Sequence, residues 1–249
     1  MRDAIGLLTR LPMGGAASSE PALGGAVPFL PVVGAALGVV IAAVYATGSS
    51  VLPDLVAATV AIGTGMLLTG ALHEDGLADM VDALGAGGPE EALRIMDDPV
   101  HGTFGVLALV VTSVIRISAL AALSDASALA VLVGAHSLAR ASSAWGLRLP
   151  AAKTRGSGAS FVEATGAGSV SSAFAIATVV GAVALGVWVI PALVACIACS
   201  WAVYAAARKR FGGITGDVLG AAEQLSELAV LLIGAAAMAR GWSGLPWWR

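Results

Sequence analysis

The chain has 249 residues, of which 58% are hydrophobic and 12% are charged, and its formal net charge is −3. About a quarter of the residues in an ordinary soluble domain are charged, so this composition excludes a soluble enzyme and a disordered chain. The negative net charge also argues against a nucleic-acid-binding protein, which needs a basic surface. The composition instead indicates an all-α, polytopic integral membrane protein with a single membrane-embedded domain over residues 1–249.

Apolar runs divide the chain into membrane-spanning candidates. A transmembrane helix needs about 20 mostly apolar residues. The sequence predicts about seven such helices in a bundle, and a short cytoplasmic amphipathic helix at 76–84 after the second of them. The apolar runs lie at 27–47, 55–72, 105–123 and 128–147, in two parts of 170–208 divided at Pro191, and at 220–239.

The basic residues between these runs predict the orientation of the bundle. With the N-terminus inside, the outer segments carry only Arg240 and Arg249. The cytoplasmic segments carry Arg2, Arg10, Arg94, Arg148, Lys153, Arg155, Arg208, Lys209 and Arg210. Because basic residues favour the cytoplasmic side, the long polar connections are expected there, together with any chemistry.

The segment 73–105 contains a cluster of acidic residues. Asp75, Asp79 and Asp82 have the spacing i, i+4, i+7, which places the three carboxylates on one face of a helix. Like charges at this spacing repel, and hard divalent ions such as Mg²⁺ prefer carboxylate oxygens. A Mg²⁺ site is therefore one interpretation, and a solvated acidic face of an interfacial helix is the other.

A second acidic set lies near the end of the chain. Asp217 is expected near a helix start, and Glu223 and Glu227 fall in the first turns of the last apolar run. Acids inside a span are costly and indicate function by default. The alternative is that they form ion pairs with Arg116 or Arg140 and serve packing.

Basic side chains on the same side could contact phosphate. His73, at the end of the second run, could position a phosphate, act as a base, or be an ordinary interfacial histidine. The other candidates are Arg10, Arg94, His136 with Arg140, Arg148, Lys153 and Arg155. Acids that hold a metal, together with cations that hold phosphate, are the recurring parts of phosphoryl transfer.

Five blocks of sequence resemble one known family. They are L-T-R-L-P at 8–12, H-x-D-G-L-A-D-x-x-D at 73–82, I-M-x-D at 95–98, G-T-F-G-V-L-A-L at 102–109 and G-G-x-T-G-D-x-L-G-A followed by Glu227 at 212–227. In this order they are similar to the adenosylcobinamide-GDP ribazoletransferases, the cobalamin (5′-phosphate) synthases of vitamin B12 assembly. The resemblance covers essentially the whole chain.

The resemblance implies a reaction and a location. The 3′-hydroxyl of α-ribazole, or of its 5′-phosphate, would attack the cobinamide-side phosphorus of adenosylcobinamide-GDP and release GMP. The product would be adenosylcobalamin or its 5′-phosphate, and Mg²⁺ would be the cofactor. The family lies in the bacterial inner membrane, so the resemblance implies a multi-pass protein with a cytoplasmic active site. The lipid bilayer would be a partner, and homo-oligomers or assemblies with other enzymes of the pathway are further expectations.

Carried over by position, the resemblance suggests roles for individual residues. The expected Mg²⁺ ligands are Asp75, Asp79, Asp82 and Asp217. The expected catalytic residues are Asp82, Asp217, Glu227 and His73, and the acid that takes the proton of the hydroxyl is left open. The expected substrate contacts are Arg10, Arg94, Asp98, Arg140, Lys153 and Arg155.

Two other functions compete with this interpretation. One is an enzyme like the CDP-alcohol phosphotransferases that acts on a lipid head group, although the spacing here differs from the D-x-x-D-G-x-x-A-R pattern. The other is a transporter coupled to protons or metal ions, which predicts acids near mid-span and polar groups on both faces. The acids here concentrate near the cytoplasmic ends of the runs, which favours an enzyme.

Overall fold

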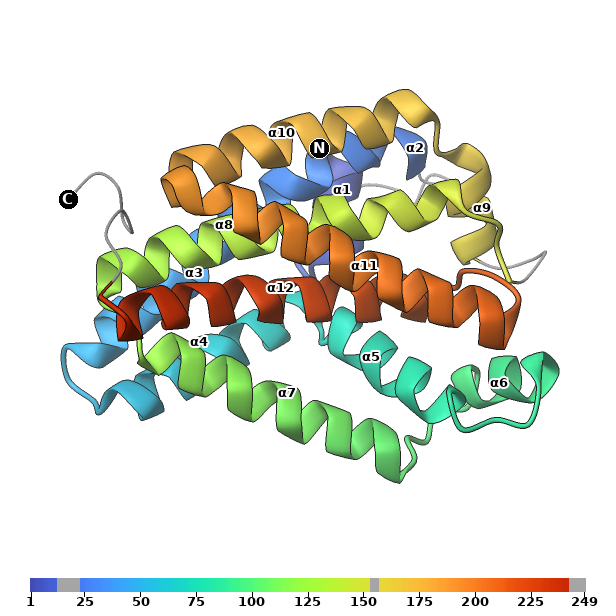
Figure 1. Cartoon of the computed structure of the whole chain (residues 1–249), viewed down its shortest axis with the longest axis horizontal. Helices are drawn as coiled ribbons and strands as arrows, with labels where there is room; N and C mark the ends of the chain where they lie inside the picture. Colours follow the sequence, from blue (N-terminus) through green and yellow to red (C-terminus); the bar gives the residue numbers. More distant parts are fainter. Residues whose placement is uncertain (13–22, 153–156, 242–249) are drawn as a thin grey trace.

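The computed structural model describes residues 1–12, 23–152 and 157–241, and in these ranges the chain forms helices and no strand (Figure 1). The expected all-α bundle is therefore confirmed. The longer helices are α3 (Leu30–Ser49), α4 (Asp54–Thr69), α7 (Thr103–Ala121), α8 (Asp125–Ala144), α10 (Ala167–Leu185), α11 (Val189–Phe211) and α12 (Gly216–Ala239). The shorter ones are α1 (Arg2–Leu8), α2 (Leu23–Ala26), α5 (Leu72–Ala83), α6 (Pro89–Met96) and α9 (Ser157–Ala164).

Each of the seven expected apolar runs corresponds to one of the longer helices. By length and composition, four helical segments of the described chain could cross a membrane, or five if the bent pair α4 and α5 is one span. The four are Gly24–Ser49, Thr103–Ala121, Ala167–Phe211 and Gly216–Ala239. Helix α8 is not among them, because His136, Arg140 and several serines lower its hydropathy. The number of spans therefore stays a prediction.

The break in the run 170–208 lies at Gly186 and not at Pro191 as expected. Gly186 has φ 58° and ψ −131°, a conformation that residues other than glycine rarely adopt. Pro191 lies in the first turn of α11, where a missing N–H removes no helical hydrogen bond. A proline that looks like a helix breaker is here part of a helix start.

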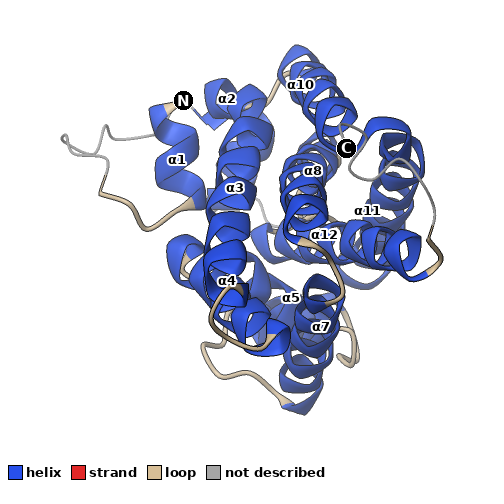
Figure 2. Cartoon of the chain, turned by 90° about the vertical axis from the view of Figure 1, so that its left-hand side faces the viewer, coloured by secondary structure: helices blue, strands red, loops and turns tan. Residues whose placement is uncertain are grey.

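Helix α8 is the central helix of the bundle. It lies among α3, α10, α11 and α12 in the end-on view (Figure 2). Small residues allow the backbones to approach closely, since a Cβ atom on Gly38 of α3 would lie 2.6 Å from the carbonyl oxygen of Leu132 on α8. The largest apolar core forms between these helices, and it includes Ile41, Leu132 and Leu185.

A sharp bend separates α5 from α4. The two helices differ in direction by 88°, and Gly70 and Ala71 both have positive φ at the bend. Helix α5 is the amphipathic helix that the sequence places outside the spans, although it starts four residues earlier than the predicted 76–84. Together with α6 and the first turns of α7 and α12, it forms one end of the molecule, on the right in Figure 1.

Candidate active site

Two glycines bring α5 against the first turns of α12. A Cβ atom on Gly76 would lie 2.9 Å from the Cα atom of Asp217, and one on Gly220 would lie 3.3 Å from the Cα atom of His73. The helices cross with their backbones nearly in contact, and glycine at both positions permits this crossing. The crossing places the aspartates of α5 beside Asp217 of α12.

We call Asp75, Asp79, Asp217 and His101 the acidic site. The ring of His101 lies between two carboxylates, with Nδ1 3.1 Å from Asp79 Oδ1 and Nε2 3.4 Å from Asp75 Oδ1. Asp75 is 61% exposed, whereas only 11% of the Asp79 side chain is exposed. Burial, followed by the nearby charges of Asp75 and Asp217, raises the pKa of Asp79 to about 6, although His101 opposes this shift. The site is therefore a crowded set of acids that a cation would stabilise.

Local hydrogen bonds fix Asp217 at the start of α12. The side chain of Thr215 accepts from the N–H of Val218 as the N-cap of this helix. The Thr215 hydroxyl also donates to Asp217 Oδ2 at 3.2 Å. One residue thus begins the helix and orients the carboxylate.

Asp82, the third acid of the first motif, contacts the start of α7. Its Oδ2 accepts from the N–H of Gly102 at 2.7 Å, and its Oδ1 accepts from the N–H of Gly105 at 2.8 Å. The structure therefore gives both oxygens of Asp82 a backbone partner.

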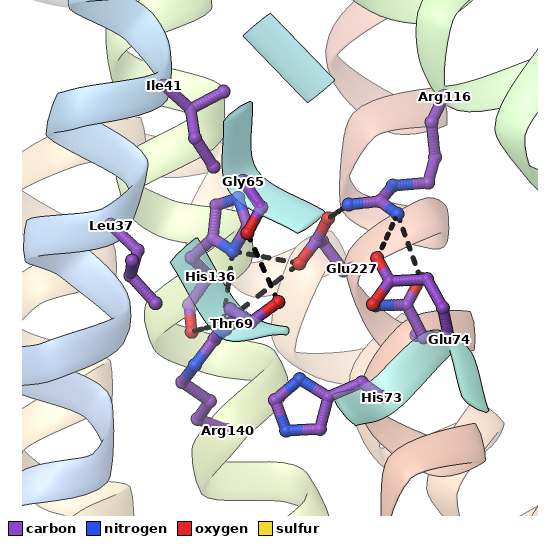
Figure 3. A pocket seen from close by; sticks show the side chains of 11 residues that line it. Leu37, Ile41, Gly65, Thr69, His73, Glu74, Arg116, His136, Arg140 and Glu227 are labelled. Carbon is purple, nitrogen blue, oxygen red and sulfur yellow. Dashed lines mark hydrogen bonds and ion pairs between the residues drawn. The ribbon is translucent and has the colours of Figure 1, made fainter. Parts of the chain in front are cut away.

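Deeper in the bundle, charged side chains from four helices form a buried ionic network (Figure 3). Arg116 of α7 donates to Glu227 at 2.6 Å, to Glu74 at 2.9 Å and to Gln224 at 3.0 Å. The network consists of His73 and Glu74 on α5, Arg116 on α7, His136 and Arg140 on α8, and Glu223, Gln224 and Glu227 on α12. It lines a small cavity between these helices and α3 and α4.

The second half of the network centres on Arg140. Its Nη1 atom lies 2.7 Å from Glu223 Oε1 and 3.0 Å from His136 Nδ1, and His136 Nδ1 lies 2.8 Å from Glu227 Oε2. The ligand atoms of His136, Glu223 and Glu227 are close enough to hold a metal ion. The guanidinium of Arg140 already supplies a positive charge among them. The ion pairs with Arg116 and Arg140, one of the two interpretations of Glu223 and Glu227 from the sequence, are present.

Apart from Asp82, the structure separates the predicted catalytic and Mg²⁺-binding residues into two groups. Asp75, Asp79 and Asp217 meet at the acidic site. Glu227 lies ten residues further along α12, about 15 Å away at 1.5 Å per residue, and belongs to the network. His73 also belongs to the network, with its Nδ1 atom 3.4 Å from Glu223 Oε2.

The predicted substrate contacts are scattered. Arg94 on α6 is 80% exposed, and its guanidinium is 3.9 Å from Glu91. Asp98 Oδ1 accepts from the N–H of Val100 at 3.0 Å. Arg10 lies at the bend between α4 and α5, where its N–H donates to the carbonyl of Leu68. Arg140 is buried in the network, and Lys153 and Arg155 lie outside the described residues.

The sequence did not indicate His101 as a functional residue. Its one signal is its position, since it directly precedes the G-T-F-G block and follows the acidic pair Asp97 and Asp98. Spacing alone gives no reason to bring it to Asp75, because 26 residues separate the two. In the structure, the chain returns through α6, and this return brings His101 to Asp75 on α5.

The fold and the site define a helical membrane protein with an acidic site at one end of its bundle. A family model described as cobalamin-5-phosphate synthase matches residues 1–235, and the chain belongs to this family. Its relatives include three proteins named adenosylcobinamide-GDP ribazoletransferase. The one from Bradyrhizobium diazoefficiens is 43% identical over 95% of this chain and 93% of its own length.

The other two relatives are similar over most of their length. The protein from Allorhizobium ampelinum is 37% identical over 91% of this chain and 92% of its own. The protein from Ralstonia pickettii is 36% identical over 92% of this chain and 91% of its own. No solved structure matches. The family resemblance inferred from the five sequence blocks is confirmed.

Proposed function

We propose that this protein transfers the adenosylcobinamide phosphate group from adenosylcobinamide-GDP to the 3′-hydroxyl of α-ribazole or of its 5′-phosphate. The new bond joins the hydroxyl oxygen to the cobinamide-side phosphorus, the phosphoanhydride bond breaks, and GMP leaves. The family membership and the names of the relatives support the reaction. One observation supports the proposed position of the active site: Asp75 and Asp79 lie near Asp217 at an exposed end of the bundle.

The charge of the acidic site supports the proposal that a divalent cation binds there. Carboxylates from two helices converge there, and crowding and burial make their combined negative charge unfavourable. We propose that Asp75, Asp79 and Asp217 hold Mg²⁺, which prefers such oxygens and leaves room for substrate phosphate. When bound, Mg²⁺ would neutralise the negative charge of the diphosphate and of the leaving GMP.

Asp217 is our candidate for the residue that takes the proton of the attacking hydroxyl. The sequence also offered Glu227, but its carboxylate is buried and paired with Arg116 and His136. Asp217 lies in the acidic site, where Thr215 orients it. Arg10, Arg94, Lys153 and Arg155 stay candidates for phosphate contact.

The acidic site is proposed to face the cytoplasm from the bacterial inner membrane. Arg208, Lys209 and Arg210 close α11, which ends beside the start of α12. Arg240 follows α12 at the opposite end. This distribution agrees with the preference of basic residues for the cytoplasmic side. The substrates would then enter from the cytoplasm, and the bilayer would surround the apolar helices.

The proposal can be tested with purified protein in lipid vesicles. Adenosylcobinamide-GDP, Mg²⁺ and either α-ribazole or its 5′-phosphate are supplied, and GMP and the cobalamin product are both quantified. We expect equal amounts of the two products, and none when Mg²⁺ is chelated. Asp79→Asn should abolish turnover, while Asp54→Asn should leave it unchanged, since Asp54 is an exposed acid at the start of α4.

Two results would overturn parts of this proposal. If folded protein forms no cobalamin with either acceptor, the reaction is wrong, and lipid head-group transfer and ion transport become the functions to test. If Asp79→Asn remains fully active, the reaction stands and the assignment of the acidic site is wrong.

A further inference from the structure

Asp82 bonds to the backbone in a way that separates it from the other aspartates of its motif. Its two carboxylate oxygens accept from the N–H groups of Gly102 and Gly105, at 2.7 Å and 2.8 Å. Gly102 precedes α7 and Gly105 lies in its first turn, where the N–H groups have no partner within the helix. Asp82 therefore caps a helix that begins 21 residues later in the sequence. Hydrogen bonds from N–H groups to a carboxylate at such a terminus are among the strong ones.

The two glycines of α7 are needed for this contact. A Cβ atom on Gly102 would lie 2.6 Å from Asp82 Oδ1, and a Cβ atom on Gly105 would come closer still to Oδ2. Only glycine leaves room for the carboxylate against the helix start. The contact thus accounts for both glycines of the G-T-F-G block, and it links that block to the third aspartate of the first motif.

The capped residue Gly102 directly follows His101. The hydrogen bond from Gly102 to Asp82 therefore fixes the backbone that carries the imidazole ring. That ring lies between the carboxylates of Asp75 and Asp79, at 3.4 Å and 3.1 Å. A shift of this backbone would move His101 and, through it, both carboxylates.

We propose that Asp82 is a positioning residue that acts through the start of α7 and His101, and that it is not a ligand of the bound cation. This inference rests on the proposed function, in which Asp75, Asp79 and Asp217 hold the cation. Helical spacing and the family motif both group Asp82 with these residues. The structure distinguishes it by its two backbone N–H partners, which hold its carboxylate at the start of α7.

Mn²⁺ binding separates a ligand from a positioning residue. Mn²⁺ replaces Mg²⁺, and its binding to protein in lipid is followed by electron paramagnetic resonance without substrate. We expect Asp79→Asn to abolish binding and Asp82→Asn to bind Mn²⁺ with a half-saturation within about twofold of wild type. Turnover of Asp82→Asn should still fall, by up to about 100-fold, the loss expected for a misplacement of about 1 Å. The loss should appear as a lower kcat, while the Mn²⁺ concentration required for half-maximal activity stays the same.

The glycines provide a second route to the same test. Gly102→Ala keeps the Asp82 carboxylate but displaces it, because the three atoms nearest to the added Cβ atom would all belong to Asp82. It should therefore lower kcat as Asp82→Asn does while Mn²⁺ binding persists. The double variant of Gly102→Ala and Asp82→Asn should be no less active than the less active of the two single variants, because both changes disrupt the same contact. Asp82→Glu, which retains a carboxylate, should recover part of the activity. Glu91→Gln is the matched control, because Glu91 accepts from the N–H of Gly87 at 2.9 Å on exposed α6 and should have no effect.

Three outcomes would overturn the inference. In one, Asp82→Asn weakens Mn²⁺ binding as much as Asp79→Asn does. In another, Gly102→Ala retains full turnover, a test that holds even if Asp82→Asn does not fold. In the third, amide hydrogen exchange at 102–105 is not accelerated in Asp82→Asn. Failure of the proposed metal site gives a different result, since wild type would then bind no Mn²⁺ while the exchange result still decides the role of Asp82.

Discussion

Arg116 on α7 donates a hydrogen bond of 2.6 Å to Glu227 on α12, and its other terminal nitrogen donates one of 2.9 Å to Glu74 on α5. One buried guanidinium therefore joins the two helices whose first turns carry the acidic site. Truncating one partner of such a pair is costly because it leaves uncompensated charge inside the protein. The network thus supports the site from the interior without touching it.

Arg116→Met should destabilise the protein by about 3–5 kcal/mol, because two buried carboxylates lose their partner. Unfolding by SDS in mixed micelles, followed by circular dichroism, measures this change. Arg94→Met is the control, since Arg94 is 80% exposed and such surface changes stay within about 0.5 kcal/mol. An unchanged midpoint for Arg116→Met would show that the ion pairs contribute nothing to stability.

Gly76→Ala should separate α5 from α12. Its Cβ atom would lie 2.9 Å from the Cα atom of Asp217, so the helices must move apart at a cost of about 1–3 kcal/mol, and turnover should fall. Gly63→Ala in α4 is the matched control, because a Cβ atom there meets no atom within 4 Å. The control should be as stable as wild type or more stable by up to about 1 kcal/mol. GMP release and SDS unfolding are measured on both variants, and equal activities would argue against the close crossing.

Two helix caps separate an effect on stability from an effect on catalysis. Thr215 caps α12 and Ser124 caps α8, so replacing either with Ala should cost about 1 kcal/mol. Only Thr215 also donates to Asp217, so only Thr215→Ala should lower kcat. The two variants are compared by their kcat values, measured under conditions in which both remain fully folded. Equal kcat values for the two variants would show that Thr215 does not orient Asp217.

Mg²⁺ should stabilise the folded protein in the absence of substrate. At about 100 times its dissociation constant, a ligand of the native state contributes about 2.7 kcal/mol. We expect the unfolding midpoint to rise with Mg²⁺ in wild type and in Asp54→Asn, and to stay constant in Asp79→Asn. A rise of the same size in Asp79→Asn would place the ion elsewhere.

Much of the fold could be predicted from apolar runs, because each run was long enough to define a helix. Helix boundaries were less predictable. Pro191 is compatible with the first turn of a helix, whereas Gly186 adopts a backbone conformation that its sequence neighbours do not reveal. Helix α6, a short segment in a polar connection, had no apolar run to indicate it.

The candidate site was predictable only in part. Helical spacing correctly brings Asp75 and Asp79 to one region, and their meeting with Asp217 depends on how α5 crosses α12. Spacing could not separate Asp82 from them, because its partners are backbone N–H groups 20 and 23 residues away. Spacing could not place Glu227 either, since the choice between a catalytic role and an ion pair with Arg116 depends on tertiary packing.

Glu74 and Asp75 are neighbours in sequence, yet one faces Arg116 inside the bundle and the other faces water beside His101. Successive residues of a helix differ by 100° in direction. The interior ion pair therefore fixes the rotation of α5 about its own axis, and this rotation aims the exposed carboxylate. A change that loosens this angle deep inside the bundle would therefore misdirect Asp75 as surely as a change at the surface.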